Sequence, residues 1–267
     1  MSVTSLGEPI AGTGNIYAWG EGQITKLWGD GAPEGWVEHL GKMERALYEA
    51  GLPVPEVREI IEVDGQLGQI YERIEGESLA DGLLGEGGAD PARIVRSAQI
   101  FAEVHAKIHA CGNVPELPLQ REFVPAVIRR STVLPAELKV AVLKAFDELP
   151  AGDRVCHGDF HPYNVLLSPK GPIVIDWNNG HIGNPLEDVA LSLLILSGVS
   201  ASQPPLRSRI EQFSQSYLER YFELRPDDRT QLAAWRPIAA ALRLSDDIPQ
   251  IQTGLLEQIR IGLAGPG

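Results

Sequence analysis

The sequence predicts an α+β fold of two lobes: a small N-terminal antiparallel sheet with one helix, and a larger, mainly helical C-terminal part. Short β-branched runs separated by turns that contain glycine dominate the N-terminal part. One run of apolar residues at helical spacing, over 33–51, interrupts them. Beyond residue 90, most apolar positions recur at helical spacing. These patterns divide the chain into residues 1–75 and residues 76–267.

The first predicted hairpin pairs residues 16–19 with residues 24–28. A loop ahead of it contains Gly12 and Gly14, which allow a phosphate to approach the backbone closely. Lys26 lies in the second strand and faces opposite to its two neighbours. Turn glycines and one exposed lysine are the simpler interpretation. The order of loop, hairpin and lysine favours a phosphate-binding arrangement.

Two further strands are predicted over 57–62 and 67–74, and the boundary between the lobes over 75–78. The glycine-rich stretch 82–88 is expected to be a loop. A buried helix is predicted to begin beside Pro185. The other predicted helices of this part cover 91–110, 123–130, 135–148, 206–223, 229–245 and 248–263.

A second hairpin, with strands near 165–167 and 172–175, forms the centre of the C-terminal part. Asp159 and Asn164 lie on the loop that enters it, and Asp176 lies at its exit. Because the open ends of a hairpin lie together, these three side chains are expected to converge. Oxygen ligands of this kind suit Mg²⁺ with a phosphorylated substrate.

The pattern H-x-D-x-x-x-x-N, formed here by His157, Asp159 and Asn164, resembles the aminoglycoside phosphotransferase / choline kinase-like family. That resemblance implies a protein-kinase-like fold and ATP-dependent transfer of a γ-phosphoryl group to a hydroxyl of a small molecule. It makes Asp159 the catalytic base, and it makes Asn164 and Asp176 the ligands of Mg²⁺. His157 and Asp188 are then expected to support the catalytic loop.

The same resemblance assigns nucleotide-binding roles in the N-terminal lobe. Lys26 and the glycine loop would hold the phosphates of ATP, or of GTP in its place. The backbone from Glu72 to Ile74 would take the adenine edge. The glutamate expected to pair with Lys26 is displaced, since its usual position falls near Leu40. Glu38 and Glu44 are both candidates, and Glu44 is slightly favoured because it shares the apolar face of the helix.

Other interpretations of these residues stay open at this point. His157 and His161 could bind zinc, although they lie on a loop without an obvious third ligand cluster. His105 and His109 are predicted to be core histidines rather than ligands. The displaced glutamate would also fit a nucleotide-binding regulator without turnover. A protein kinase is disfavoured because Gly158 replaces the arginine of H-R-D.

Charge and composition narrow the choice of partners. The net charge of −13 argues against nucleic acid and anionic membranes as main partners. No secretory signal is visible, and two cysteines make no disulfide framework, so a cytoplasmic protein is expected. Residues 201–267 carry eight acids and eight bases, which disfavours a polycationic aminoglycoside as the acceptor. Choline-like amines, sugars, amino-acid alcohols and macrolides are further acceptors of the family. Candidate acceptor residues are Trp235, Arg243, Asp246 and Asp247.

Overall fold

The computed structural model describes residues 6–10, 15–29, 31–85, 90–226, 229–246 and 248–264. The chain forms two compact units, each of which is described by itself. Unit 1 contains Met1–Glu77 and Leu166–Asn178, and unit 2 contains Ser78–Val165 and Asn179–Gly267. Most of the second hairpin, which the sequence assigns to the C-terminal part, therefore belongs to unit 1. Val174 N donates to Pro53 O over 2.6 Å, which ties the hairpin to this unit.

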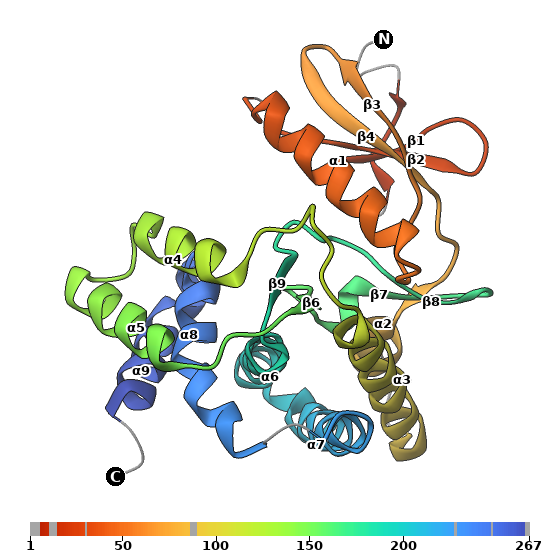
Figure 1. The fold of residues 1–267 in the computed structure, drawn as a ribbon. Coiled ribbons are helices and arrows are strands. Elements are labelled where there is room, and N and C mark those ends of the chain that lie inside the picture. Colours follow the sequence, from red (N-terminus) through yellow and green to blue (C-terminus); the bar gives the residue numbers. More distant parts are fainter. Residues whose placement is uncertain are drawn as a thin grey trace. The chain divides into compact units, whose positions relative to one another are not determined.

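A four-stranded antiparallel sheet in the order β1-β2-β4-β3 forms the centre of unit 1. Its strands are β1 (Ile16–Ala18), β2 (Gln23–Leu27), β3 (Val57–Val63) and β4 (Gln66–Glu72). Helix α1 (Glu34–Glu49) runs beside the sheet (Figure 1) and buries Val37, Leu40, Met43 and Leu47. Thr25 and Leu27 are buried, whereas Lys26 between them faces the other side of β2, as predicted.

The second hairpin is formed by β7 (Val165–Ser168) and β8 (Gly171–Val174). The short strand β5 (Glu77–Ser78) adds to β7 and makes a three-stranded sheet. Lys170 in the turn forms an ion pair with Glu72 over 3.1 Å, which holds the hairpin against the end of β4.

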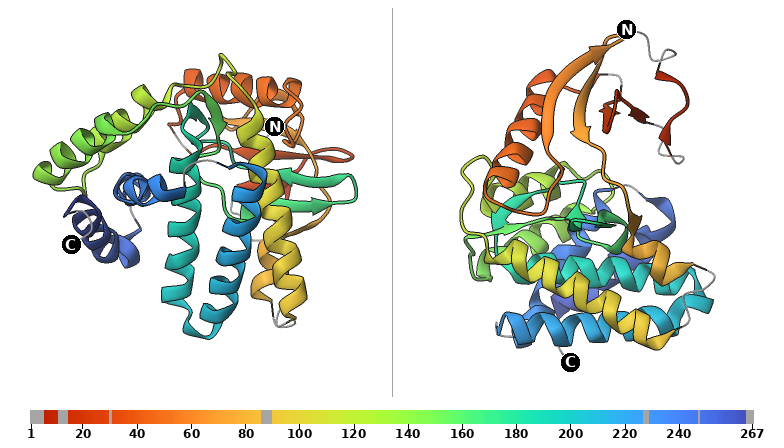
Figure 2. Two further views of the ribbon diagram at one scale, coloured as in Figure 1. Left: turned by 60° about the horizontal axis from the view of Figure 1, so that its bottom comes forward. Right: turned by 90° about the vertical axis from the view of Figure 1, so that its right-hand side faces the viewer.

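Unit 2 is mainly helical, and α3, α6 and α7 lie side by side in it (Figure 2). Rings of Phe101, Phe160, Phe213 and Tyr217 pack together in its core. Strand β6 (Arg154–Cys156) pairs antiparallel with β9 (His181–Gly183). The helices are α2 (Leu79–Leu84), α3 (Pro91–Ala110), α4 (Gln120–Arg130), α5 (Ala136–Glu148), α6 (Pro185–Ser202), α7 (Arg207–Leu224), α8 (Leu232–Leu244) and α9 (Pro249–Ala264), with short 3₁₀ turns η3 (Pro162–Asn164), η4 (Pro204–Leu206) and η5 (Arg229–Gln231).

Several elements differ from the prediction, among them α2 and β9. Residues 82–88 were expected to be a loop, but the last half of α2 lies within them. A capping box between Ser78 and Asp81 starts this helix despite Gly82. Strand β9 is not predicted, because three residues carry no periodic signal and only pairing with β6 makes them a strand. Among the described helices, α6 alone has the length and hydropathy of a membrane span, and half of that window is buried inside the protein.

Candidate active site

Asp159 lies on the loop between β6 and η3. At Gly158 this loop has a backbone conformation that only glycine adopts easily. Gly158 has φ +75°, and a Cβ on it would clash with the backbone oxygen of Asn179. His157, the residue before it, is buried, and its Nδ1 accepts from Asp159 N over 3.2 Å. An arginine in place of Gly158 would not fit, so the loop excludes the H-R-D form of protein kinases.

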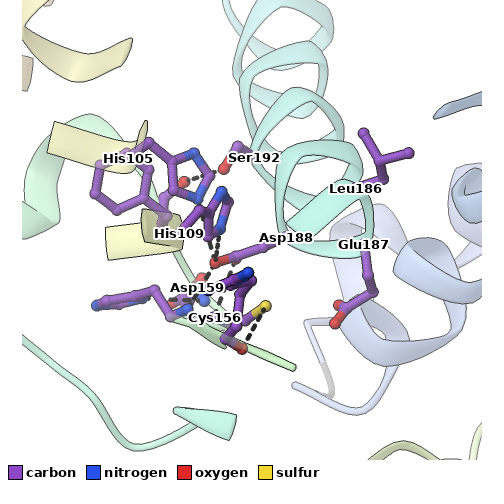
Figure 3. A network of polar contacts seen from close by, with 12 residues as sticks. His105, His109, Cys156, Asp159, Leu186, Glu187, Asp188 and Ser192 are labelled. Atoms are coloured by element: carbon purple, nitrogen blue, oxygen red, sulfur yellow. Dashed lines mark hydrogen bonds and ion pairs between the residues drawn. The ribbon is translucent and has the colours of Figure 1, made fainter. Parts of the chain in front are cut away.

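The Asp188 carboxylate binds the backbone of this loop (Figure 3). Its Oδ2 accepts from His157 N over 2.6 Å, and its Oδ1 accepts from Gly158 N over 3.0 Å. The Nε2 atoms of His105 and His109 lie 3.2 and 3.3 Å from the same Oδ2. Asp188 is fully buried, and four nitrogen donors therefore surround one carboxylate.

The two imidazoles are neutral donors to Asp188. Burial lowers the pKa of His109 to about 3, and burial also lowers the pKa of His105. Burial alone would raise the pKa of Asp188, but its hydrogen bonds from the two histidines hold it well below the ordinary value. Tyr217 OH and Tyr221 OH lie 2.7 and 2.6 Å from the respective Nδ1 atoms and complete the network.

This network settles the interpretation of the two helix histidines. Ligand atoms of His105, His109 and Asp188 lie within 4.8 Å of one another, as a metal site would require. However, both nitrogens of each ring already have a hydrogen-bond partner of suitable chemistry. They are the satisfied core histidines that the sequence predicts.

Asp159 lines a cavity of about 450 Å³ within unit 2. Arg243 Nη1 lies 3.6 Å from its Oδ1 and 2.6 Å from Asp246 Oδ2, so two carboxylates share one guanidinium. His161 Nε2 lies 3.5 Å from Asp159 Oδ2, and Asn164 Nδ2 donates to the backbone oxygen of Asp159 over 3.0 Å. The contact of Arg243 joins residues 84 positions apart, and nothing in the sequence spacing indicates it.

The other residues predicted to bind the acceptor lie in different surroundings. Asp246 lies beside Asp159. Burial raises the pKa of Asp246 above its ordinary value, and the negative charge of Asp159 raises it further. Trp235 is fully buried beside Phe146 in the helical core and does not line the cavity that Asp159 lines. Asp247 lies outside the described residues.

In unit 1, the chain brings Lys26 and Asp176 together across 150 residues of sequence. Lys26 Nζ lies 3.0 Å from Asp176 Oδ1, and Asn178 Nδ2 donates to the same oxygen over 2.6 Å. Asp176 has φ +69°, a left-handed conformation that is uncommon for residues other than glycine. Strained backbone of this kind is concentrated at functional sites, and Asp176 is the predicted metal ligand at the exit of the hairpin.

A cavity of about 430 Å³ within unit 1 has predicted nucleotide-binding residues on its walls. Its lining includes Lys26, Glu44, Tyr71, Glu72, Ile74 and Asp176. Glu38 instead faces Lys42 over 3.9 Å on an exposed part of α1. Gly12 and Gly14, predicted to approach the phosphates, lie outside the described residues. Asn164 belongs to unit 2, and its predicted convergence with Asp176 stays a prediction.

Glu44 is the buried glutamate of α1, but its hydrogen bond is with Tyr71 rather than Lys26. Tyr71 OH lies 2.9 Å from Glu44 Oε2 and 3.0 Å from Gln69 Oε1, which accepts from Trp28 Nε1. Burial raises the pKa of Glu44 to about 7 against the lowering effects of Tyr71 and Lys26. When Glu44 is protonated it can donate to Tyr71, which then donates to Gln69.

Glu44→Gln is expected to remove a pH dependence of stability. Because burial raises the pKa of Glu44 from 4.5 to about 7, its favourable contribution is complete below pH 4.5 and is lost as pH rises through 7. The loss amounts to about 3 kcal/mol for the wild type relative to the variant. Urea unfolding of both proteins at pH 5 and pH 8 measures it. Glu38→Gln, on the exposed part of the same helix, is the matched control, and an equal slope in all three proteins would contradict the assignment.

A family model described as the phosphotransferase enzyme family matches residues 37–235. A solved aminoglycoside-3'-phosphotransferase of type VIII is similar, with TM-score 0.60, 22% identity, and 88% of this chain and 91% of that chain covered. A choline/ethanolamine kinase family protein from Mesorhizobium loti has TM-score 0.61 and 17% identity, over 97% and 88% of the two chains. An amicoumacin kinase solved with AMP-PNP and Ca²⁺ has TM-score 0.64 and 13% identity, over 93% and 84%.

Two curated proteins match part of the chain. Acyl-CoA dehydrogenase family member 10 of Mus musculus is 24% identical over 178 residues, which are 59% of this chain and 16% of that protein. Acyl-CoA dehydrogenase family member 11 of Pongo abelii is 28% identical over 173 residues, which are 56% of this chain and 22% of that protein. The matched part of the chain thus spans about a fifth of the length of these relatives.

The solved structures confirm the predicted two-lobed, protein-kinase-like α+β class. The family model extends from α1 to α8 and includes the loop with Asp159, the second hairpin and Asp188. The chain therefore belongs to the phosphotransferase enzyme family.

Proposed function

We propose that this protein is a kinase that transfers the γ-phosphoryl group of ATP to a hydroxyl of a small molecule. One observation carries the proposal: Asp159 lies on the wall of a cavity of about 450 Å³, on a loop whose backbone Asp188 holds at two consecutive N–H groups. Membership of the phosphotransferase family supports the same reaction class. A cavity of this size admits a small molecule beside the carboxylate.

In the proposed mechanism, Asp159 orients the acceptor hydroxyl and receives its proton. Lys26 binds phosphate oxygens of the nucleotide, and the segment from Glu72 to Ile74 offers backbone groups to the adenine edge. Binding of phosphate would replace the ion pair that Lys26 forms with Asp176. Phosphoryl transfer has a loose transition state, so these residues act mainly by position and charge.

Asn164 and Asp176 are the residues that we propose to hold Mg²⁺. They offer an amide oxygen and a carboxylate, which are hard donors of the kind that Mg²⁺ prefers. The side chain of Asp176 is 39% exposed, so an ion can reach it. Bound Mg²⁺ supplies positive charge that offsets the charge of the phosphates.

The test is phosphoryl transfer from radiolabelled ATP to a panel of alcohols in the presence of Mg²⁺. The panel contains aminoglycosides, choline-like amines, sugars, amino-acid alcohols and macrolides, and GTP replaces ATP in a parallel series. We expect label to appear in at least one acceptor class and to disappear when EDTA removes the metal. ATP consumption at the background level with every class would overturn the proposal.

A nucleotide-binding regulator without turnover is the second candidate. Its support is the position of Glu44, which is hydrogen-bonded to Tyr71 while Lys26 forms its ion pair with Asp176. This candidate predicts ATP binding, measurable by calorimetry, without transfer to any alcohol. We also propose a cytoplasmic location, because two cysteines in a chain of this length make no disulfide framework.

A further inference from the structure

The cavity beside Asp159 contains a second carboxylate, that of Glu187 in the first turn of α6. Glu187 is fully buried. Its Oε2 lies 2.8 Å from His181 Nε2 and accepts from Gln120 Nε2 over 3.1 Å. Its Oε1 is buried and has no hydrogen-bond partner among the residues that the structure describes. A buried carboxylate oxygen without a donor is unfavourable, and because Glu187 lines the cavity, a donor carried by a ligand would satisfy it.

The partners of Glu187 hold its carboxylate in one orientation. Gln120 Oε1 accepts from Asn184 N over 3.2 Å, so the Nε2 atom of the same amide must face Glu187. A Cβ on Gly183 would lie 2.6 Å from Gln120 Cδ, which shows how closely this amide is packed. The two N–H donors, Gln120 Nε2 and His181 Nε2, both contact Oε2. Rotation of the carboxylate would exchange its two oxygens and still leave one of them without a donor.

His181 is fixed in the same way. Its Nδ1 lies 2.9 Å from Asn179 O, which can only accept, so Nδ1 carries a proton. Its ring stacks on Phe123, with the ring centroids 5.1 Å apart. Burial alone would lower the pKa of His181, but the Glu187 carboxylate raises it above the ordinary value. His181 thus donates to Glu187 Oε2 and cannot satisfy Oε1 as well.

Glu187 and its neighbour Asp188 have different surroundings. Figure 3 shows the two side chains leaving the start of α6 toward different sides. Asp188 accepts from four nitrogens and anchors the catalytic loop, so its hydrogen-bonding capacity is used inside the protein. Glu187 instead accepts from Gln120 and His181 and lines the cavity.

The other charged side chains of the cavity are two carboxylates and two guanidinium groups. Asp159 and Asp246 share Arg243, and the exposed Arg130 adds a second guanidinium to the lining. Apolar side chains form much of the remaining wall: Phe123, Val127, Val133, Leu191, Leu242 and Leu244. Such a lining suits a compact molecule with an apolar body and few polar groups better than a polycation.

We propose that Glu187 is a specificity-determining residue of the acceptor cavity, and that its Oε1 receives an N–H or O–H of the acceptor. The enzyme then selects compact diols and amino alcohols, which carry a second donor beside the hydroxyl that is phosphorylated, over alcohols with one functional group. This inference rests on the proposed function. An acceptor without the second donor leaves Oε1 buried and unpaired, which is expected to lower kcat/KM by about 10- to 100-fold.

The test uses a matched trio of ring alcohols: cyclohexanol, trans-1,2-cyclohexanediol and trans-2-aminocyclohexanol. For the wild type, we expect kcat/KM for the diol or the amino alcohol to exceed that for cyclohexanol by about 10- to 100-fold. The two donor-bearing compounds distinguish an O–H from an N–H donor. Comparable values for all three compounds in the wild type would overturn the inference, and this comparison needs no variant.

Two variants locate the effect. Glu187→Met keeps the volume and removes the acceptor oxygen, so it is expected to abolish the preference while leaving the KM for ATP unchanged. In Glu187→Gln the amide oxygen is expected to stay on His181 and Gln120, which puts an N–H₂ at the position of Oε1, so this variant should also lose the preference. Glu116→Gln, an exposed carboxylate of the same unit, is the control. Circular dichroism verifies that each variant is folded, and a preference that persists in Glu187→Met contradicts the assignment.

Failure of the kinase proposal is recognised separately. If no alcohol is phosphorylated, binding of the same three compounds is measured by saturation-transfer NMR on wild type and Glu187→Met. Binding of the diol or amino alcohol that exceeds binding of cyclohexanol, and that is lost in Glu187→Met, supports the recognition site without the kinase activity. Equal signals for the three compounds, or no binding, overturn it.

Discussion

Asp159→Asn is expected to lower kcat for acceptor phosphorylation about a thousandfold, within the range usual for loss of a general base. The amide cannot accept the proton of the hydroxyl, and it lacks the charge that orients the hydroxyl toward the phosphate. Arg243 keeps its 2.6 Å ion pair with Asp246, so the surrounding structure loses little. The backbone N–H of Asp159 still donates to His157, because the substitution leaves the backbone in place.

The measurement combines single-turnover kinetics with the affinity for ATP determined by calorimetry. We expect the affinity for ATP to be unchanged, since Asp159 does not line the cavity of unit 1 that we propose for the nucleotide. Asp153→Asn provides the matched control, because this carboxylate is 79% exposed and lies just before β6. A variant that turns over at the wild-type rate would remove Asp159 from the role of base.

Asp188→Asn is expected to destabilise unit 2 by about 3–5 kcal/mol, the usual cost of removing one member of a buried charged network. The carboxylate accepts from two backbone N–H groups and two histidines, whereas an Asn presents its own N–H₂ to some of these donors. At least one buried donor is then left without a partner. The anchored loop, with Asp159 on it, should lose order as a result.

Thermal unfolding measures this effect, and for a chain of this size each kcal/mol corresponds to roughly 2–4 °C in Tm. The exposed Asp153→Asn again serves as the control and should leave Tm unchanged. Hydrogen exchange at the amides of His157 and Gly158 reports directly on the lost anchor, because both donate to Asp188 in the wild type. A Tm equal to that of the wild type would show that the network contributes little to stability.

Much of the fold could be predicted from local patterns. The helix over Pro91–Ala110 has apolar residues at helical spacing and a proline at its first position, so the chain specifies its start and its buried face. Both hairpins have β-branched runs around turn residues, and the strands form where these runs lie. Strand β9 had no such signal, because its three residues become a strand only through β6.

The candidate site, too, was predicted from the sequence only in part. The motif of His157, Asp159 and Asn164, with Asp176 and Asp188 at fixed intervals after it, indicates the family and the reaction class from residue identity alone. Residue types carry that information because proton transfer and metal binding need particular groups. The choice between Glu38 and Glu44 depended on which side of α1 is buried, and helical spacing favoured Glu44 only slightly.

Which side chains contact one another in the site was decided only by the tertiary structure. It pairs Lys26 with Asp176, places Arg243 between Asp159 and Asp246, and leaves one oxygen of Glu187 without a donor. Glu187 and Asp188 are adjacent acids in the sequence, yet Asp188 is fully hydrogen-bonded whereas Glu187 keeps one buried oxygen without a donor in the wall of the cavity. The physical reason is that a buried polar group is satisfied by whatever the fold packs against it, and those neighbours come from segments far away along the chain.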